Sequence, residues 1–133
     1  MSTIPTYNAS EPWGGNTLEV DVNLQYTGLE YHYIYLILCA IIVWPILPGI
    51  GLLYGGLASR KSALTLLLQS FLVGAVITIQ WMLWGYSLAY SRTAGPFIGD
   101  TSMFLMRGVM AAPSPGNAMI PDIVFCFYQL LFW

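Results

Sequence analysis

The stretch that decides the fold is YIYLILCAIIVWPILPGIGLLY, residues 33–54, which contains no charged side chain. A helix of this length, at about 1.5 Å per residue, covers roughly 33 Å and can cross the ~30 Å hydrocarbon core of a bilayer. Backbone amides and carbonyls find no water inside that core, so a helix is the conformation that satisfies them. The sequence therefore predicts a first transmembrane helix over about 33–55.

A second uncharged run extends from Ser62 to Ser91, directly after the basic pair Arg60 and Lys61. It is longer than the ~20 residues that a transmembrane helix needs, so the predicted helix over about 63–90 tilts or protrudes from the bilayer. Two such runs in one short chain predict an all-α integral membrane protein.

Composition supports the membrane class and excludes others. Of the 133 residues, 57% are hydrophobic and only 8% are charged, where a soluble domain has about 25% charged residues. The net charge is −2 and Arg60–Lys61 is the only adjacent basic pair, so nucleic-acid binding is not expected. With a single histidine and no catalytic or metal-ligand motif, neither an enzyme nor a metal or other cofactor is predicted. Cys39 and Cys126, inside apolar runs, are interpreted as buried free thiols.

A loop is predicted over 91–119, where Gly95-Pro96 and Pro113-Ser114-Pro115-Gly116 are turn signals. Its apolar segment 102–110 is charged only at Arg107 and predicts a short amphipathic helix lying along the membrane surface. By the parity of the spans, the whole loop is expected on the external side.

A third helix is predicted over 120–133, beginning near Pro121 and Asp122. Proline needs no amide partner in a first helical turn, and an acidic side chain there complements the helix dipole. A helix from residue 120 to Trp133 covers only roughly 21 Å, which is less than the hydrocarbon core. We therefore expect two complete transmembrane helices and the start of a third, in a fragment or a truncated gene product, because a helix that ends in hydrocarbon leaves backbone groups unpaired.

The distribution of charge predicts the topology. Residues 1–30 contain acidic side chains and no Lys or Arg, whereas Arg60 and Lys61 lie between the two spans. By the positive-inside rule, the Arg60–Lys61 turn lies in the cytoplasm and residues 1–30 form an external tail. Asn8-Ala9-Ser10 in that tail is an acceptor sequence for N-glycosylation, so a glycan on Asn8 would agree with this topology.

Small residues gather in the inner half of the first span. Gly51 and Gly55 form a small-xxx-small pair, which lets a second helix approach closely. The residues predicted to form this helix-packing surface are Pro48, Gly49, Gly51, Gly55 and Gly56.

Three local strings, read in order, resemble the ammonium transporter family, the ammonia channels and methylammonium permeases related to the Rh proteins. PGIGLLYGG at 48–56, followed by Arg60-Lys61, is similar to the family's first-helix exit and its basic cytoplasmic turn. WMLWGYSLAY at 81–90 looks like the end of the family's second helix, and FCFYQLLF at 125–132 looks like the start of its third. The resemblance covers residues from about 29 to 132.

The resemblance implies the larger architecture and two site residues. Members of this family are trimers of 11-helix subunits, so residues 31–133 would be the N-terminal part of such a transmembrane domain in the plasma membrane. Tyr128 would help to form the external cation site, and Phe132 would belong to the outer gate. The sequence departs from the common family pattern at Ser62, Tyr128 and Trp133.

The function implied is passage of ammonium or ammonia across the membrane by the intact protein. The family's pore histidines and buried aspartate belong to helices that this sequence does not include, so the chain alone is not expected to conduct. The alternative is a non-conducting membrane remnant, or a regulatory partner that inserts beside full-length subunits. A receptor or unrelated channel would need all three strings to match by coincidence.

Overall fold

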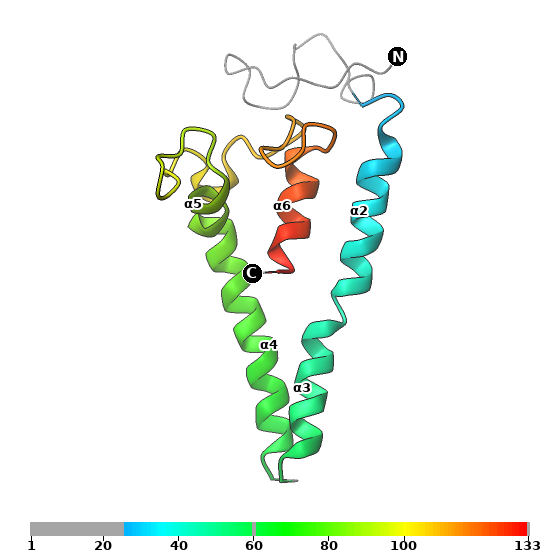
Figure 1. Ribbon diagram of the computed structural model, residues 1–133. Coiled ribbons are helices and arrows are strands. Elements are labelled where there is room, and N and C mark those ends of the chain that lie inside the picture. The colour runs from blue at the N-terminus through cyan, green and yellow to red at the C-terminus, as the bar shows by residue number, and fades with distance from the viewer. Residues whose placement is uncertain (1–25, 60, 133) are drawn as a thin grey trace.

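The computed structural model describes residues 26–59 and 61–132, and these are arranged as two long helical rods with a short helix between them (Figure 1). The rods meet at the turn that contains Lys61 and diverge toward the other end of the molecule. Among the described residues the only β-type pairing is an isolated bridge between Pro113 and Pro121. The helices of the two rods and of the segment that follows them are α2 (Glu30–Val43), α3 (Ile46–Leu57), α4 (Ala63–Gln80), the π-helix η1 (Trp81–Gly85), α5 (Tyr86–Tyr90), the 3₁₀ turn η2 (Phe104–Met106) and α6 (Asp122–Leu130).

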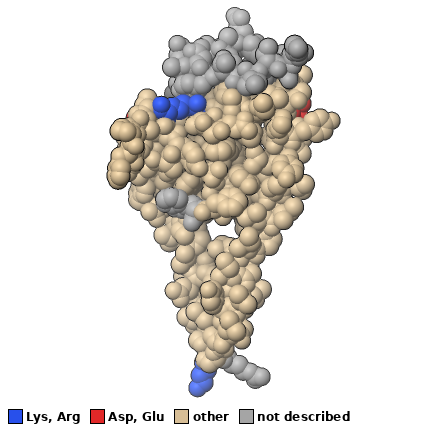
Figure 2. All heavy atoms as spheres, viewed as in Figure 1, with Lys and Arg blue, Asp and Glu red and all other residues tan. Residues whose placement is uncertain are grey.

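Each rod is long and apolar enough to cross a membrane. The two candidate spans, Glu30–Leu57 and Ala63–Tyr90, contain 28 residues each, which corresponds to roughly 42 Å of helix. In the most apolar part of the first rod 11% of the residues are buried by the rest of the described chain, and in that of the second rod 0% are buried. The face in Figure 2 accordingly shows a broad belt without Lys, Arg, Asp or Glu between basic side chains at its two ends. Such a surface is suited to lipid or to further helices.

The first rod begins earlier and ends later than the predicted range of 33–55, and it contains a break. Glu30 opens α2, and its carboxylate accepts a hydrogen bond from the backbone amide of Gly28 at 2.8 Å. Trp44 and Pro45 separate α2 from α3. Proline lacks the amide that would continue the helical ladder, so the ladder stops and restarts there.

The second rod runs from Ala63 to Tyr90 and changes its winding on the way. Over Trp81–Gly85 the chain forms a π-helix, and the amide of Tyr86 bonds to the carbonyl of Trp81. A Cβ atom on Gly85 would lie 3.0 Å from the ring of Trp81, so the wide turn brings the indole against the backbone of residue 85. The pattern of apolar residues does not reveal this change, because a single π turn inserts into an otherwise regular helix.

Small residues allow α3 and α4 to approach each other at the narrow end of the molecule. A Cβ atom on Gly51 would lie 3.2 Å from Ser70 and 3.3 Å from Leu67, and one on Gly55 would lie 3.4 Å from the carbonyl oxygen of Ala63. Gly49 and Gly56 have open space around the position of a Cβ atom. Within the described chain, two of the four predicted packing glycines therefore face α4 and two face outward.

The loop after α5 differs from its predicted form. The expected amphipathic helix over 102–110 is wrong, because only the 3₁₀ turn Phe104–Met106 is present there. Leu105 and Met106 have positive φ angles of 57° and 60°. This conformation brings Cβ close to a backbone carbonyl oxygen, so residues other than glycine rarely adopt it, and it ends a right-handed helix. The segment instead folds back over the end of the second rod.

A leucine at position 51 should weaken the contact between α3 and α4. Gly51→Leu would drive a side chain against Ser70 and Leu67, and such overpacking costs about 1–3 kcal/mol. Gly49→Leu is the matched control, because it makes the same change where no atom lies within 4 Å. Thermal unfolding of the purified chain in detergent micelles should show a lower midpoint for Gly51→Leu alone, and equal midpoints would contradict this packing.

Candidate functional site

The candidate site lies at the wide end of the molecule, where α6 fits between the two rods (Figure 1). On one side, the ring of Phe127 packs edge-on against Trp44 with centroids 6.5 Å apart. On the other side, Phe125 packs edge-on against Tyr90 with centroids 5.1 Å apart. Edge-to-face aromatic contacts are favourable beyond the area that they bury. Both rods therefore fix the lateral place of α6.

The two residues that the sequence assigns to the site, Tyr128 and Phe132, lie together at the end of α6. Their ring centroids are 5.1 Å apart and the ring planes are inclined by 60°. Tyr128 is half-buried, whereas the side chain of Phe132 is 62% exposed. An aromatic pair of this kind offers electron-rich faces that attract a cation and apolar surface that repels water.

The start of α6 carries a buried polar cluster that the sequence reasoning missed. Asp122 is 0% exposed. The hydroxyl of Tyr86, itself 1% exposed, donates a hydrogen bond to one carboxyl oxygen of Asp122. Arg92 lies 3.3 Å from the other oxygen and also donates to the carbonyl of Pro113. Three segments of the chain therefore meet at one buried carboxyl group.

The backbone at the start of α6 is also paired with the preceding loop. The amide of Asp122 donates to the carbonyl of Ala112 at 2.9 Å, and the amide of Ile123 donates to the carbonyl of Met110 at 3.0 Å. The first amides of a helix have no partner within the helix, so these bonds satisfy groups that would otherwise be unpaired. The loop thus acts as a cap for α6.

Ser87 connects the end of the second rod to the same loop. Its hydroxyl donates to the carbonyl of Asp100 at 2.6 Å and accepts the amide of Met103 at 3.1 Å. The amide of Gly99 donates to the carbonyl of Leu88 at 2.9 Å. A Cβ atom on Gly99 would lie 2.5 Å from that carbonyl oxygen, so only glycine permits the approach. The carbonyl of Leu88, near the end of the rod, is therefore satisfied by a loop folded onto it.

Asp100 organises the outer part of this loop. Its carboxylate accepts hydrogen bonds from the hydroxyls of Ser91 and Thr93 and, at 3.0 Å, from the amide of Ser102. Because these donors stabilise the charged form, they hold the pKa of the Asp100 carboxyl well below its usual range. The loop is thereby held by a solvent-facing carboxylate that is separate from the buried cluster at Asp122.

A further contact joins the loop to the start of the first rod. The hydroxyl of Tyr26 donates to the carbonyl of Ala111 at 2.7 Å, and its ring packs edge-on against Tyr33. Burial, together with the negative charge of Asp122, raises the pKa of the Tyr26 phenol above its ordinary value, so the hydroxyl stays a donor. The loop is consequently tied to both rods and to α6.

The sequence contained one signal that could have revealed the buried cluster. Asp122 is an isolated acidic residue beside an apolar run, and Arg92 directly follows the second apolar run. Ionisable groups at the edge of a membrane span tend to pair with one another, so the two were candidates for an ion pair. What the sequence could not supply was their distance, because a loop of unknown path separates them.

Three other predictions concern glycosylation, metal binding and the cysteines. Asn8, the predicted glycosylation position, lies outside the described residues. Within the described ranges no group of three or more His, Cys, Asp or Glu side chains is placed to hold a metal ion. Cys39 and Cys126 are both free thiols; Cys126 is buried, whereas Cys39 is half-buried, so the prediction of burial is wrong for Cys39 within the described chain.

Comparison with known proteins shows the family of the chain. Residues 34–133 match the model of the Ammonium Transporter Family. The chain is 43% identical to ammonium transporter MEP2 of Saccharomyces cerevisiae, over 92% of this chain and 24% of that protein. It is 37% identical to ammonium transporter 1 of Schizosaccharomyces pombe, over 90% of this chain and 24% of that protein. The chain thus spans about a quarter of the length of these curated relatives.

The likeness extends to solved structures. The crystal structure of Mep2 from Candida albicans superposes with a TM-score of 0.78 at 34% identity, covering 99% of this chain and 28% of that one. Together with the two apolar rods, this likeness confirms the predicted all-α membrane architecture and the predicted family resemblance.

Proposed function

The chain belongs to the ammonium transporter family, and we propose that it forms part of a protein that moves ammonium or ammonia across the plasma membrane. The observation that carries this proposal is the aromatic pair of Tyr128 and Phe132, with ring centroids 5.1 Å apart on a helix held between two membrane-length rods. The rings lie at the inner end of a helix that enters the space between the rods from the wide end (Figure 1). An aromatic pair in this place is suited to collecting a small cation that arrives from the wide end.

The two rings would contribute differently. Tyr128 is the proposed external cation site, because an aromatic face attracts ammonium more strongly than it attracts neutral solutes. Phe132 is the proposed outer gate, where apolar contact removes water from the substrate. Desolvation disfavours the charged form of ammonium, so loss of a proton becomes easier beyond this point.

The complete pore would need more chain than this sequence supplies. We propose that the sequence is the N-terminal part of a longer transporter, or a truncated product that does not conduct alone and is not an enzyme. The quarter-length match to the relatives supports this view. We further propose that the complete protein is a homotrimer, and native mass spectrometry of that protein would reveal a different assembly.

A second candidate function is a non-conducting remnant or a regulatory partner that inserts beside full-length subunits. The apolar surface of the rods favours a partner of this kind, because a groove of about 300 Å³ between α3 and α4 is open along their sides. Leu47, Tyr54 and Gln69 are among the residues that line it. A transmembrane helix that can form a hydrogen bond with the side-chain amide of Gln69 would fill such a groove more favourably than lipid does.

Transport by the complete open reading frame tests the proposed function. The transcript should be read across the codon for Trp133, and the whole reading frame expressed in yeast cells that lack their own ammonium transporters. Growth on low ammonium is expected if translation continues past that codon. A stop directly after Trp133, together with absence of growth, would favour the non-conducting alternative.

Loss of the aromatic face at position 128 should weaken substrate capture. In the complete protein, Tyr128→Leu should raise the KM for methylammonium uptake roughly 2- to 30-fold, since a cation–π contact contributes about 0.5–2 kcal/mol. Tyr128→Phe keeps the ring and should leave the KM nearly unchanged. Tyr54→Leu makes the same change on α3, at the narrow end, and serves as the control. A KM that responds equally to both leucine variants would count against a cation site at Tyr128.

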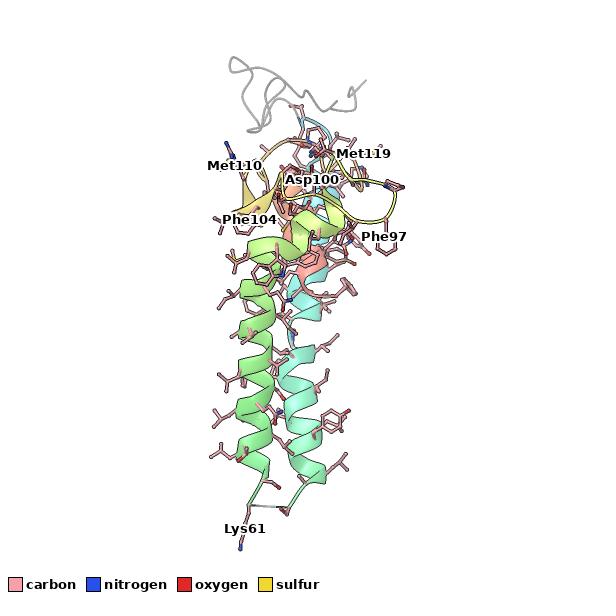
Figure 3. All side chains as sticks on the ribbon, turned by 90° about the vertical axis from the view of Figure 1, so that its left-hand side faces the viewer. Lys61, Phe97, Asp100, Phe104, Met110 and Met119 are labelled. Atoms are coloured by element: carbon pink, nitrogen blue, oxygen red, sulfur yellow. The ribbon has the colours of Figure 1, made fainter. Side chains whose placement is uncertain are left out.

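We also propose the topology that the charge distribution predicts, with the Arg60–Lys61 turn in the cytoplasm and the opposite end outside. In Figure 3, Lys61 lies at one end of the molecule and Phe97 and Asp100 lie at the other, so the two could face opposite sides of a membrane. With Cys39 and Cys126 replaced by serine or alanine, Phe97→Cys should react with a membrane-impermeant maleimide on intact cells. Phe97 is 96% exposed, so access is not limited by packing. Lys61→Cys should react only after permeabilisation, and the reverse pattern would invert the topology.

A further inference from the structure

Building on the proposed function, we propose that Asp122 is a positioning residue for the substrate entrance. Its buried contacts with Tyr86 and Arg92 set the depth and the rotation of α6, and α6 in turn places the ring pair Tyr128 and Phe132.

The contacts of Asp122 come from segments that are distant in the sequence. Tyr86 donates from the start of α5, and Arg92 approaches to 3.3 Å from the loop after it. Arg92 is in turn bonded to the carbonyl of Pro113, in the loop that leads into α6. A carboxyl group that is 0% exposed must be paired, because an unpaired buried charge is strongly unfavourable. The cluster therefore ties these three segments together at one buried group.

The helix transmits this arrangement to the rings. Tyr128 lies about 9 Å along the axis from Asp122, at the rise of an α-helix. Phe132 follows in the turn directly after α6, where its amide bonds to the carbonyl of Gln129 at 3.0 Å. At about 100° per residue, Asp122 and Tyr128 point in directions roughly 120° apart. Asp122 thus faces the second rod without touching the rings, and a change in its contacts would move the rings through the helix.

The two ends of α6 are held by different kinds of contact. The hydrogen bonds that join α6 to the preceding loop lie in its first turn, from the amides of Asp122 and Ile123. Toward its end the helix contacts the first rod through the Phe127–Trp44 ring pair, and Trp44 and Phe127 are both well exposed. Cys126 is 2% exposed and Leu130 packs against the same apolar core, so the later part of α6 is held by packing. The hydrogen bonds that fix direction lie at the start of α6, and loosening them would therefore shift or rotate the rings.

Uptake kinetics in the complete protein test the proposal. Asp122→Asn keeps the shape of the side chain but loses its charge, and should raise the KM for methylammonium roughly 3- to 30-fold while turnover per surface molecule changes less. Tyr86→Phe is the milder second variant, should Asp122→Asn fail to reach the surface. If both changes act through one cluster, the double variant should raise the KM by less than the product of the two single effects. Asp100→Asn removes a carboxylate from the separate loop cluster and should leave the KM unchanged.

A second measurement does not depend on transport. In a protein with Cys39 and Cys126 replaced, the pair Trp44→Cys and Phe127→Cys reports whether the end of α6 lies against the first rod. Crosslinking of this pair should fall several-fold with Asp122→Asn or Tyr86→Phe and stay constant with Asp100→Asn. If the unmodified protein carries no substrate yet the crosslink still responds, the proposed function fails while the positioning of α6 stands. The role of Asp122 would be overturned if Asp122→Asn and Tyr86→Phe left the crosslinking unchanged. It would also be overturned if these variants transported with an unchanged KM while present at the cell surface in the same amount as the unmodified protein.

Discussion

Backbone hydrogen bonding within the chain is the constraint on which the rest of the structure depends. Inside a bilayer no water is available, so the amides and carbonyls in the membrane-embedded part of each rod must find partners in the protein. Helices supply these hydrogen-bond partners within the same segment. Where the regular helical bonds are interrupted, another backbone group of the chain takes the place of the missing partner. At the break near Pro45, the amide of Gly49 still bonds to the carbonyl of Pro45 at 3.0 Å. At the far end of the second rod, the loop amide of Gly99 completes the ladder.

The two ends of the molecule are held by different interactions. At the narrow end, α3 and α4 approach through Gly51 and Gly55, so van der Waals contact between close backbones provides the packing. At the wide end, the rods have diverged and α6 and its loop fill the space between them. Here polar contacts to Asp122 and Asp100 replace close helix packing. Polar networks are directional, so they specify one arrangement where small residues would allow sliding.

Membership of the ammonium transporter family offers an explanation for the exposed apolar surface of the rods. The chain spans about a quarter of its curated relatives, and its rods bury almost none of their apolar residues within the described chain. In a complete transporter, part of that surface would meet further helices and part would meet lipid.

The sequence by itself determined the membrane spans and the aromatic pair. Length and absence of charge are local properties, so the runs around 33–54 and 62–91 identify two spanning helices without any knowledge of packing. Tyr128 and Phe132 are four residues apart, and helical spacing alone brings such residues together. Only the tertiary structure decided that residues 102–110 do not form an amphipathic helix and that Asp122 bonds to Tyr86 and Arg92. Those outcomes depend on contacts between segments joined by a loop, and the path of a loop is not encoded in any local periodicity.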